Sequence, residues 1–315
     1  MKPLSLGQAA RIQKQKPASV SPPARPCAHP YGTAKAPPPE KKTRHTGSLI
    51  VRALVLAAAA MTFGVLIFLI VYILVNGIPH LKLSLFSFTY DSNNVSMFPA
   101  IVNTIAITAL SLLIAIPFGI FTAIYLVEYA GRGNKIVALI RLAAETLSGI
   151  PSIVYGLFGM LFFVTYLEWG YSLLAGAATL SIMILPLVMR TTEEALASVP
   201  DAFREASFGL GAGRLRTIFH IVLPSAVPGI LAGVILSVGR IVGETAALIY
   251  TAGTVAAIPG DVLGSGRTLA LHMYLLSSEG LHTGEAYATA VVLLVTVLAI
   301  NTLSAFIAKK VGKTS

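Results

Sequence analysis

The stretch D-A-F-R-E-A-S-F-G-L-G-A-G-R-L-R-T-I-F-H-I-V-L-P, residues 201–224, is a long polar passage between hydrophobic segments. Its start suits a helix, because Pro200 lacks an N–H that a first turn does not need and Asp201 is negative. Four residues at helical spacing share one face: Phe203, Ala206, Ser207 and Leu210. Gly211 and Gly213 allow a stop and a turn before a second helical pattern, which we expect Pro224 to close. The stretch predicts a helix–turn–helix between two membrane spans.

The composition is that of a polytopic membrane protein. Of 315 residues, 55% are hydrophobic and 11% are charged, whereas a soluble domain has about 25% charged residues. The net charge of +10 is concentrated in residues 1–52, which hold ten of the 23 Lys and Arg and one acid, Glu40. Basic residues beside a membrane orient the chain and contact anionic lipid, so we expect membrane lipid and no nucleic acid as partners. Cys27 is alone, which excludes a disulfide within the chain.

Two regions are expected. Residues 1–47 contain nine of the eighteen prolines and predict a disordered basic cytoplasmic tail. Residues 48–315 form the transmembrane domain, whose 190–224 loop contains the opening stretch. The fold class is all-α, because six apolar stretches are each long enough to cross the bilayer as a helix: 50–75, 98–125, 136–163, 171–189, 225–252 and 286–308.

Lys and Arg in the connections set the orientation. The basic connections are the tail, 126–135, 190–224 and the end of the chain, whereas 76–97, 164–170 and 253–285 hold only Lys82 and Arg267. Both termini and the 190–224 loop are therefore predicted to be cytoplasmic. The outward 253–285 segment includes an amphipathic run, 267–276, that we expect to form a short interfacial helix or a lip for a soluble partner.

Two predicted spans carry an Arg and a Glu four residues apart, Arg141 with Glu145 and Arg240 with Glu244. This spacing places each pair on one helix face. A lone charge at mid-bilayer costs about 2.5–3.5 kcal/mol, and pairing relieves much of that cost. A buried guanidinium also suits an oxyanion. The pairs are candidate substrate-pathway residues, and a structural ion pair between helices is the alternative.

Other chemistry is not indicated. His80, His220, His272 and His282 lack ligand spacing and are interpreted as interfacial or loop residues, so we expect no metal site and no catalytic residue. The sequence lacks G-x-x-x-x-G-K, so it has no nucleotide-binding loop of its own. We expect no cofactor in this chain. ATP with Mg²⁺ would be bound by a partner ATPase.

The opening stretch resembles the EAA signature of bacterial ABC importer permeases: Glu205-Ala206-Ser207, three residues, Gly211, nine residues, then Ile221-x-Leu223-Pro224. Ser207 stands where Ala is usual. The resemblance covers about residues 50–310. It implies a type I importer permease fold in the bacterial inner membrane, with 201–216 as the coupling helix that docks on a cytoplasmic ATPase. The implied coupling residues are Arg204, Glu205, Ala206, Ser207, Gly211, Ile221, Leu223 and Pro224.

Three further runs are similar to the PstA type of phosphate importer permease: R-T-T-E-E-A-L-A-S-V-P at 190–200, S-G-I-P-S-I-V-Y-G-L-F-G at 148–159 and G-R-I-V-G-E-T-A at 239–246. Ala247 departs from the Pro that frequently follows the last run. The resemblance implies a second permease, a homodimeric ATPase and an extracytoplasmic phosphate-binding protein as partners. Three alternatives remain: the sister phosphate permease, a permease for sulfate or molybdate, and, in a different class, an ATP-independent secondary transporter.

Overall fold

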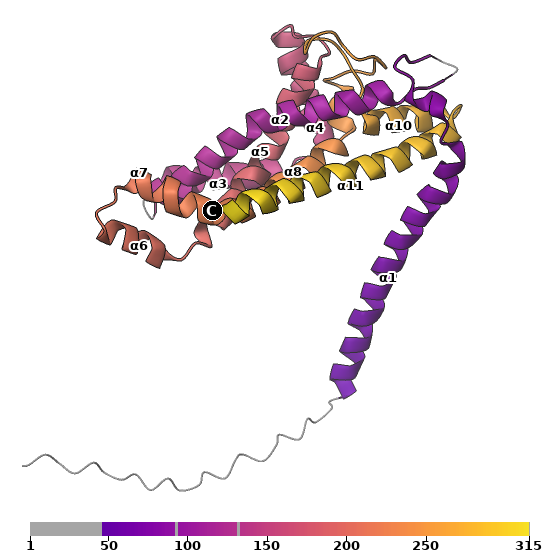
Figure 1. Cartoon of the computed structure of the whole chain (residues 1–315). Coiled ribbons are helices and arrows are strands. Elements are labelled where there is room, and N and C mark those ends of the chain that lie inside the picture. The colour runs from indigo at the N-terminus through magenta and orange to yellow at the C-terminus, as the bar shows by residue number, and fades with distance from the viewer. Residues whose placement is uncertain (1–45, 92–93, 131–132, 315) are drawn as a thin grey trace, which may run out of the picture. The chain divides into compact units, whose positions relative to one another are not determined.

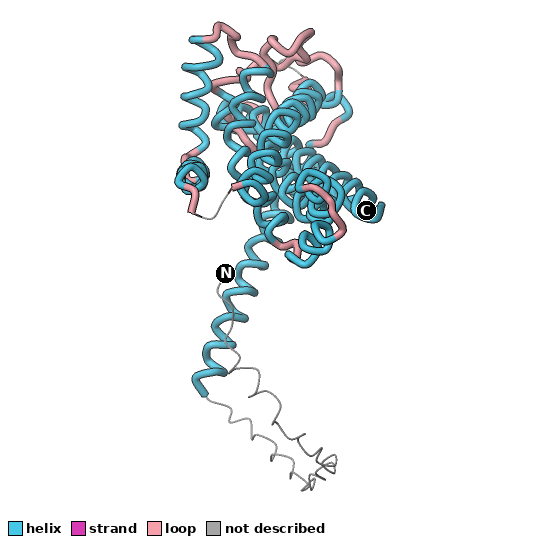
Figure 2. Tube along the Cα trace, turned by 90° about the vertical axis from the view of Figure 1, so that its left-hand side faces the viewer, coloured by secondary structure: helices cyan, strands magenta, loops and turns pink. Residues whose placement is uncertain are grey.

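The computed structural model describes residues 46–91, 94–130 and 133–314, and over these residues Figure 2 shows helices joined by loops, with no strand. The helices are α1 (Thr46–Gly77), α2 (Phe98–Ile124), α3 (Lys135–Ser148), α4 (Ser152–Gly159), α5 (Leu173–Ala197), α6 (Asp201–Gly209), α7 (Arg214–Thr217), α8 (Leu223–Val242), α9 (Ala246–Ile249), α10 (Leu269–Glu279) and α11 (Thr283–Thr314). Short 3-10 turns η2 (Ile78–His80) and η3 (Leu83–Phe86) follow α1. Three π-helical segments are η4 (Tyr125–Tyr129), η5 (Met160–Tyr166) and η6 (Ile218–Val222).

Five helices among the described residues are long and apolar enough to span a membrane: Ile50–His80, Phe98–Tyr129, Leu173–Ala197, Arg214–Val242 and Thr283–Phe306. The sixth predicted span is a pair of helices, 135–148 and 152–166, bent by 102° at a short break. The break follows from Gly149-Ile150-Pro151, because Pro151 lacks an N–H and restricts the residue before it. The all-α prediction is confirmed, and the third span is broken rather than straight.

The fifth span differs from the prediction in both of its limits. The helix starts at Arg214 and continues through Pro224 to Val242, so Pro224 does not close it and residues 243–252 are not part of it. A proline would clash with the carbonyl four residues before it in an α-helix. The π-helical turn η6 lies directly before Pro224 and widens the helix there, which lets it continue.

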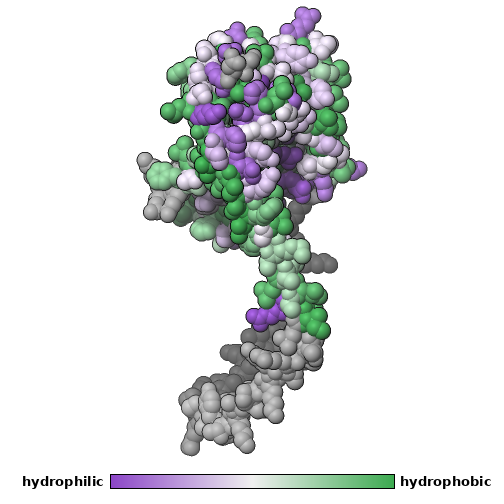
Figure 3. Space-filling view, turned by 90° about the vertical axis from the view of Figure 1, so that its right-hand side faces the viewer, coloured by the Kyte–Doolittle hydropathy of each residue, from purple (hydrophilic) through white to green (hydrophobic). Residues whose placement is uncertain are grey.

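Two units divide the chain, residues 1–59 and 60–315. The tail prediction for residues 1–47 lies outside the described residues except for Thr46 and Gly47, which begin α1. The large apolar side chains of α1 are exposed from residue 50 to residue 69, and Figure 3 shows hydrophobic surface on this helix. Such a surface is expected of a helix that faces lipid or another membrane chain.

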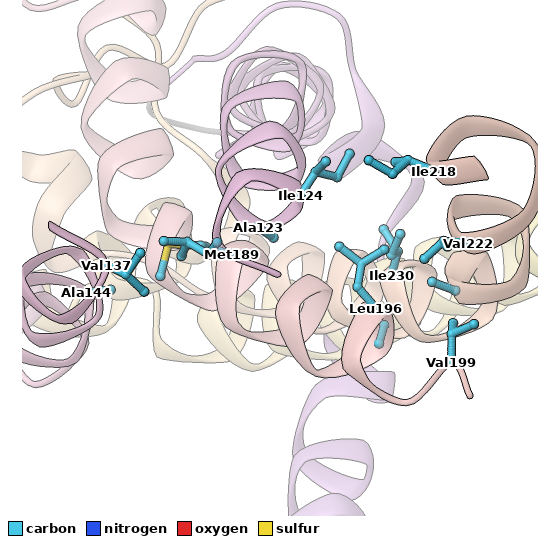
Figure 4. Packing of buried hydrophobic residues seen from close by; sticks show 13 residues of the cluster. Ala123, Ile124, Val137, Ala144, Met189, Leu196, Val199, Ile218, Val222 and Ile230 are labelled. Carbon is cyan, nitrogen blue, oxygen red and sulfur yellow. The ribbon is translucent and has the colours of Figure 1, made fainter. Parts of the chain in front are cut away.

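Three buried clusters follow one another through the second unit. One lies near α6, a second joins α2, α5, α8 and α9, and a third joins the 81–97 segment to α10 and α11. In Figure 1, α6 and α7 lie at one end of this helix bundle and α10 lies toward the other. We call these the α6 end and the α10 end. Figure 4 shows the cluster near the α6 end, where side chains of α2, α3, α5 and α8 meet those of η6.

The α10 helix corrects a prediction. Residues 267–276 were expected to form a short interfacial helix or a lip for a soluble partner, and His272 was expected at an interface or in a loop. Instead Leu269, Leu271 and His272 are fully buried. The hydroxyl of Thr104 on α2 accepts a hydrogen bond of 2.8 Å from the backbone N–H of Leu269, which ties the start of α10 to α2. The 253–285 segment is therefore partly built into the bundle.

Candidate functional site

The predicted helix–turn–helix is an elbow formed by α6 and α7 at one end of the bundle (Figure 1). Gly211 makes the turn with φ of +82°, a backbone region in which a Cβ would be strained. The hydroxyl groups of Ser207 and Thr217 lie 2.8 Å apart and hold α6 against α7. Ser207 is the residue at which the EAA pattern departs from Ala, and its hydroxyl supplies this hydrogen bond.

One hollow of about 450 Å³ lies inside the elbow. The four residues expected on one face of α6 all line it, together with Ile221 of η6: Phe203, Ala206, Ser207 and Leu210. Leu210 is 89% exposed, and Phe203 and Phe208 are also exposed. Isolated exposed apolar residues are common, but three on one nine-residue helix and its C-cap form an apolar surface that a partner can cover.

The remaining predicted coupling residues divide between surface and core. Glu205 is exposed, so its carboxylate is free to meet a partner. Leu223 packs against the buried cluster near the α6 end, and Pro224 is half-buried within the continuous helix. The structure therefore brings the EAA residues together, with some facing outward and others anchoring the elbow.

Arg204 points away from the surface on which Glu205 is displayed. Its side chain is 14% exposed and pairs with Glu128 of η4, which is 8% exposed. The carboxylate oxygen Oε1 of Glu128 accepts from Nη2 at 2.7 Å and from Nε at 3.0 Å. The guanidinium also donates to the carbonyls of Leu196 and Val199 at the end of α5. Arg204 is thus an internal tie between α6, η4 and α5.

The predicted Arg141–Glu145 pair is not formed. Arg141 of α3 pairs instead with Glu193 of α5, with Nη2 and Oε1 2.5 Å apart. Glu145, four residues along the same helix, and Glu193, on a helix packed against it, are both potential partners for Arg141. Glu193 lies closer and forms the pair. Glu145 lines a cavity of about 420 Å³ beside this pair, together with Arg190 and Glu194.

The predicted Arg240–Glu244 pair is also not formed within the described structure. The spacing argument required one continuous helix, but α8 ends at Val242. Glu244 turns to the next helix instead, where its Oε1 accepts from the backbone N–H of Ala247 in α9 at 3.1 Å. Arg240 is left exposed on the surface of this single chain.

Two helix breaks meet close to the end of α8, whose last turn contains Arg240. The hydroxyl of Tyr155 on α4 donates to the carbonyl of Leu147 at the end of α3, at 2.7 Å. A Cβ placed on Gly156 of α4 would lie 2.9 Å from the Cα of Ala247, so α4 and α9 are in close contact. Broken helices that meet at membrane depth supply free backbone groups for a substrate, as in many transporters.

Packing against α5 sets the depth of Arg240. Gly233 of α8 packs against Thr191 of α5, and Leu248 of α9 packs against Gly176 nearer the start of α5. Arg240 lies between Gly233 and Leu248 in the chain. It is therefore between these two contacts, which are 15 residues, or about 22 Å, apart along a spanning helix. Arg240 lies in the last turn of α8, within the candidate membrane span Arg214–Val242.

Sequence reasoning missed the buried contacts of three ionisable residues. For Glu128 the sequence offered one signal, because this residue is an acid that lies just after the second predicted span. Arg267 is 6% exposed, and its guanidinium carbon lies 4.6 Å from the ring centre of Tyr90. His272 lies against the same ring edge to face, at 6.3 Å between centres. The contacts of these two residues with Tyr90 link segments about 180 residues apart, which no local pattern could indicate.

Burial and the nearby charge of Arg267 lower the pKa of His272 to about 3. The backbone of Val95 opposes this shift, although neither ring nitrogen reaches hydrogen-bond geometry with any described group. His272 is therefore neutral at physiological pH.

Comparisons with known proteins agree with this architecture. Residues 115–313 match the family described as "binding-protein-dependent transport system inner membrane component". The chain is 35% identical over 266 residues to the probable ABC transporter permease protein YqgI of Bacillus subtilis, covering 77% of this chain and 88% of that protein. It is 36% identical over 215 residues to the phosphate transport system permease protein PstA 1 of Mycobacterium tuberculosis, covering 67% and 70%.

Solved structures share the fold. A chain of a bacterial alginate ABC transporter, solved with an alginate-bound periplasmic protein, superposes with a TM-score of 0.64 at 16% identity, covering 85% of this chain and 96% of that one. A chain of the MetNI methionine ABC transporter in an inward-facing conformation gives 0.53 at 20% identity, covering 68% and 94%. The fold is that of type I ABC importer permeases. The chain is a multi-pass inner-membrane protein and belongs to the family of binding-protein-dependent transport system inner membrane components.

Proposed function

We propose that this chain is a permease subunit of an ATP-driven phosphate importer. Family membership supports the permease role and sets aside the ATP-independent class. Similarity to a phosphate transport permease supports the substrate. The observation that carries the proposal is the placement of Arg240, an exposed and unpaired guanidinium in the last turn of a candidate membrane span, directly before a helix break that packs against a second one. A guanidinium fork gives an oxyanion two parallel hydrogen bonds.

The unpaired state of Arg240 shapes the expected affinity. The carboxylate of Glu244 bonds to α9 and does not hold the guanidinium of Arg240 in place. Phosphate itself would then neutralise the charge of Arg240 during passage. A transport site must bind strongly enough to admit the ion and weakly enough to release it. Because Arg240 is exposed on this chain, we propose that a second permease subunit faces it and completes the passage.

The elbow is the proposed contact with the ATPase. Its apolar surface and the exposed Glu205 would dock on a cytoplasmic homodimeric ATPase, and ATP binding there would move α6 and change the access of the passage. ATP with Mg²⁺ belongs to that partner. A phosphate-binding protein would deliver substrate at the α10 end.

Uptake of radioactive phosphate in cells that depend on this transporter tests the proposal. Arg240→Ala should abolish most uptake, Arg240→Lys should retain part of it because only the charge remains, and Gly211→Glu should abolish it by straining the elbow. Arg52→Ala, which removes an exposed arginine of α1 outside these sites, is the matched control. Normal uptake by both Arg240→Ala and Gly211→Glu would refute the proposal. Competition by sulfate or molybdate stronger than by unlabelled phosphate would instead favour another oxyanion.

A further inference from the structure

We propose that the Glu128–Arg204 ion pair is a latch that makes α2 move with the coupling elbow, and that α2 carries this movement to the α10 end. The inference rests on the proposed docking of an ATPase on α6. It adds Glu128 as a positioning residue for transport, although this residue contacts neither the proposed substrate nor the surface of α6.

The latch is buried and multiply bonded. Arg204 donates to one carboxylate oxygen of Glu128 and to the carbonyls of Leu196 and Val199. Surface ion pairs hold little because solvent screens them and two long side chains must be ordered. A buried pair differs, because removing one partner leaves the other charge buried without compensation. Pulling α6 away from η4 would have that consequence.

The same side chain also has an exposed partner, which offers an internal comparison. Nη1 of Arg204 lies 3.1 Å from Oδ1 of Asp201, a side chain that is 84% exposed. This second pair joins two residues within α6, so it cannot link α6 to another helix. Replacing Asp201 therefore removes a charged partner of Arg204 and leaves the contact between α6 and η4 in place.

Packing reinforces the latch on the α2 side. Ala123, Ile124 and Leu126 at the end of α2 and the start of η4 belong to the cluster in Figure 4. The same cluster includes Ile218 and Val222 of η6, which continue the second arm of the elbow. The helix that continues from the elbow therefore meets the end of α2 through apolar contacts of η6, and the elbow itself meets η4 through an ion pair.

The far end of α2 is tied to the α10 end. The side-chain amide of Asn103 donates to the carbonyl of Ala257 at 2.9 Å and to that of Arg267 at 3.3 Å. Thr104 accepts from the first residue of α10, Leu269. Asn103 and Glu128 are 25 residues apart, which is about 38 Å of helix. One element thus has fixed contacts at both ends of the bundle.

The measurement uses the assembled transporter. In a Cys27→Ser background, spin labels are placed at Ala202→Cys on α6 and Phe121→Cys on α2, with a second pair at Ala202→Cys and Leu303→Cys on α11. On ATP binding, the Ala202–Phe121 distance should stay constant while the Ala202–Leu303 distance changes. Glu128→Gln should allow the Ala202–Phe121 distance to change, and Asp201→Asn should behave as the parent protein does.

Function gives the second readout. In proteoliposomes, Glu128→Gln should lower phosphate uptake per ATP hydrolysed by at least about fivefold, the lower range of a typical coupling between sites. Glu128→Asp should restore part of it, whereas a residue needed only for folding would lower assembly and both rates together. Glu194→Gln, which removes an exposed carboxylate of α5 outside the elbow, should leave the ratio unchanged.

The outcomes separate the two proposals. If the Ala202–Phe121 distance changes in the parent protein as much as in Glu128→Gln, or if Glu128→Gln keeps the parent ratio, the latch is wrong. If ATP changes neither distance in the parent protein, the docking of the ATPase on α6 is wrong. The distance readout needs no substrate, so a failure of the phosphate assignment would leave it intact.

Discussion

Replacing Gly156 with Ala tests the contact between the two broken helices. The new Cβ would lie 2.9 Å from the Cα of Ala247 and 3.1 Å from the carbonyl oxygen of Ala246. Carbon atoms in favourable contact are about 3.5–4.0 Å apart, and these neighbours are backbone atoms that cannot rotate away. Overpacking of this kind costs about 1–3 kcal/mol.

Gly149, at the end of α3, provides the matched control. A Cβ there would lie 3.5 Å from its nearest neighbour, the carbonyl oxygen of Thr146, which is ordinary contact. Each substitution also stabilises the folded chain by up to about 1 kcal/mol, because Ala has a lower backbone entropy than Gly in the unfolded chain. The difference between Gly156→Ala and Gly149→Ala therefore isolates the clash, and we expect it to be about 1–3 kcal/mol in favour of Gly149→Ala.

Thermal unfolding of the purified transporter measures this difference. At about 2–4 °C per kcal/mol for a chain of this size, the Gly156→Ala protein should melt several degrees below the Gly149→Ala protein. Equal melting temperatures, or a higher one for Gly156→Ala, would show that α4 and α9 do not approach this closely. The meeting of the two breaks close to the end of α8 would then lose its support.

Three further predictions concern other parts of the chain. Arg141→Gln and Glu193→Gln should each lower stability by no more than about 1 kcal/mol, because the Arg141 side chain is half exposed. Glu145→Gln should not lower stability. Thermal unfolding of the three variants would show which of the two carboxylates pairs with Arg141. His272 has a pKa of about 3 in the folded chain and of about 6.5 in the unfolded chain. Its contribution to the free energy of unfolding is therefore complete above pH 6.5 and is lost as the pH falls toward 3. Between pH 7 and pH 5 the parent protein should lose about 2 kcal/mol more than His272→Asn in paired unfolding measurements, and parallel losses would contradict the assignment. Deletion of residues 2–45 should leave phosphate uptake near normal, and loss of uptake despite normal membrane insertion would show an active role for the tail.

Sequence reasoning recovered the elements that local pattern determines. The spans follow from runs of apolar residues, and the elbow follows from Gly211 and the helical spacing around it. The helix through Pro224 was missed because a proline normally ends a helix, and the compensating π-helical turn depends on how η6 packs in the cluster near the α6 end. The broken third span was visible only as Gly149-Ile150-Pro151, a signal common in straight membrane helices.

Side-chain partners could not be predicted in the same way. Four-residue spacing allows a pair but does not exclude a better partner on another helix, which is why Arg141 joins Glu193. Arg240 and Glu244 separated because α8 ends between them. Arg204 was expected at the docking surface by resemblance, and its inward contact joins it to Glu128, which lies 76 residues earlier in the chain. These outcomes depend on tertiary structure and not on local sequence.

If a second permease subunit covers Arg240, as proposed, the exposure of this residue would also bear on how cells keep the subunits of the transporter in proportion. In a chain that has not met its partner, this guanidinium would face lipid within a candidate membrane span, at a cost of up to about 2.5–3.5 kcal/mol. Local unfolding that brings the cation toward water would relieve this cost, and it would also expose the chain to membrane proteases. The residue proposed to carry the substrate would then also mark surplus subunits for removal, so the amount of this chain would follow the amount of its partner.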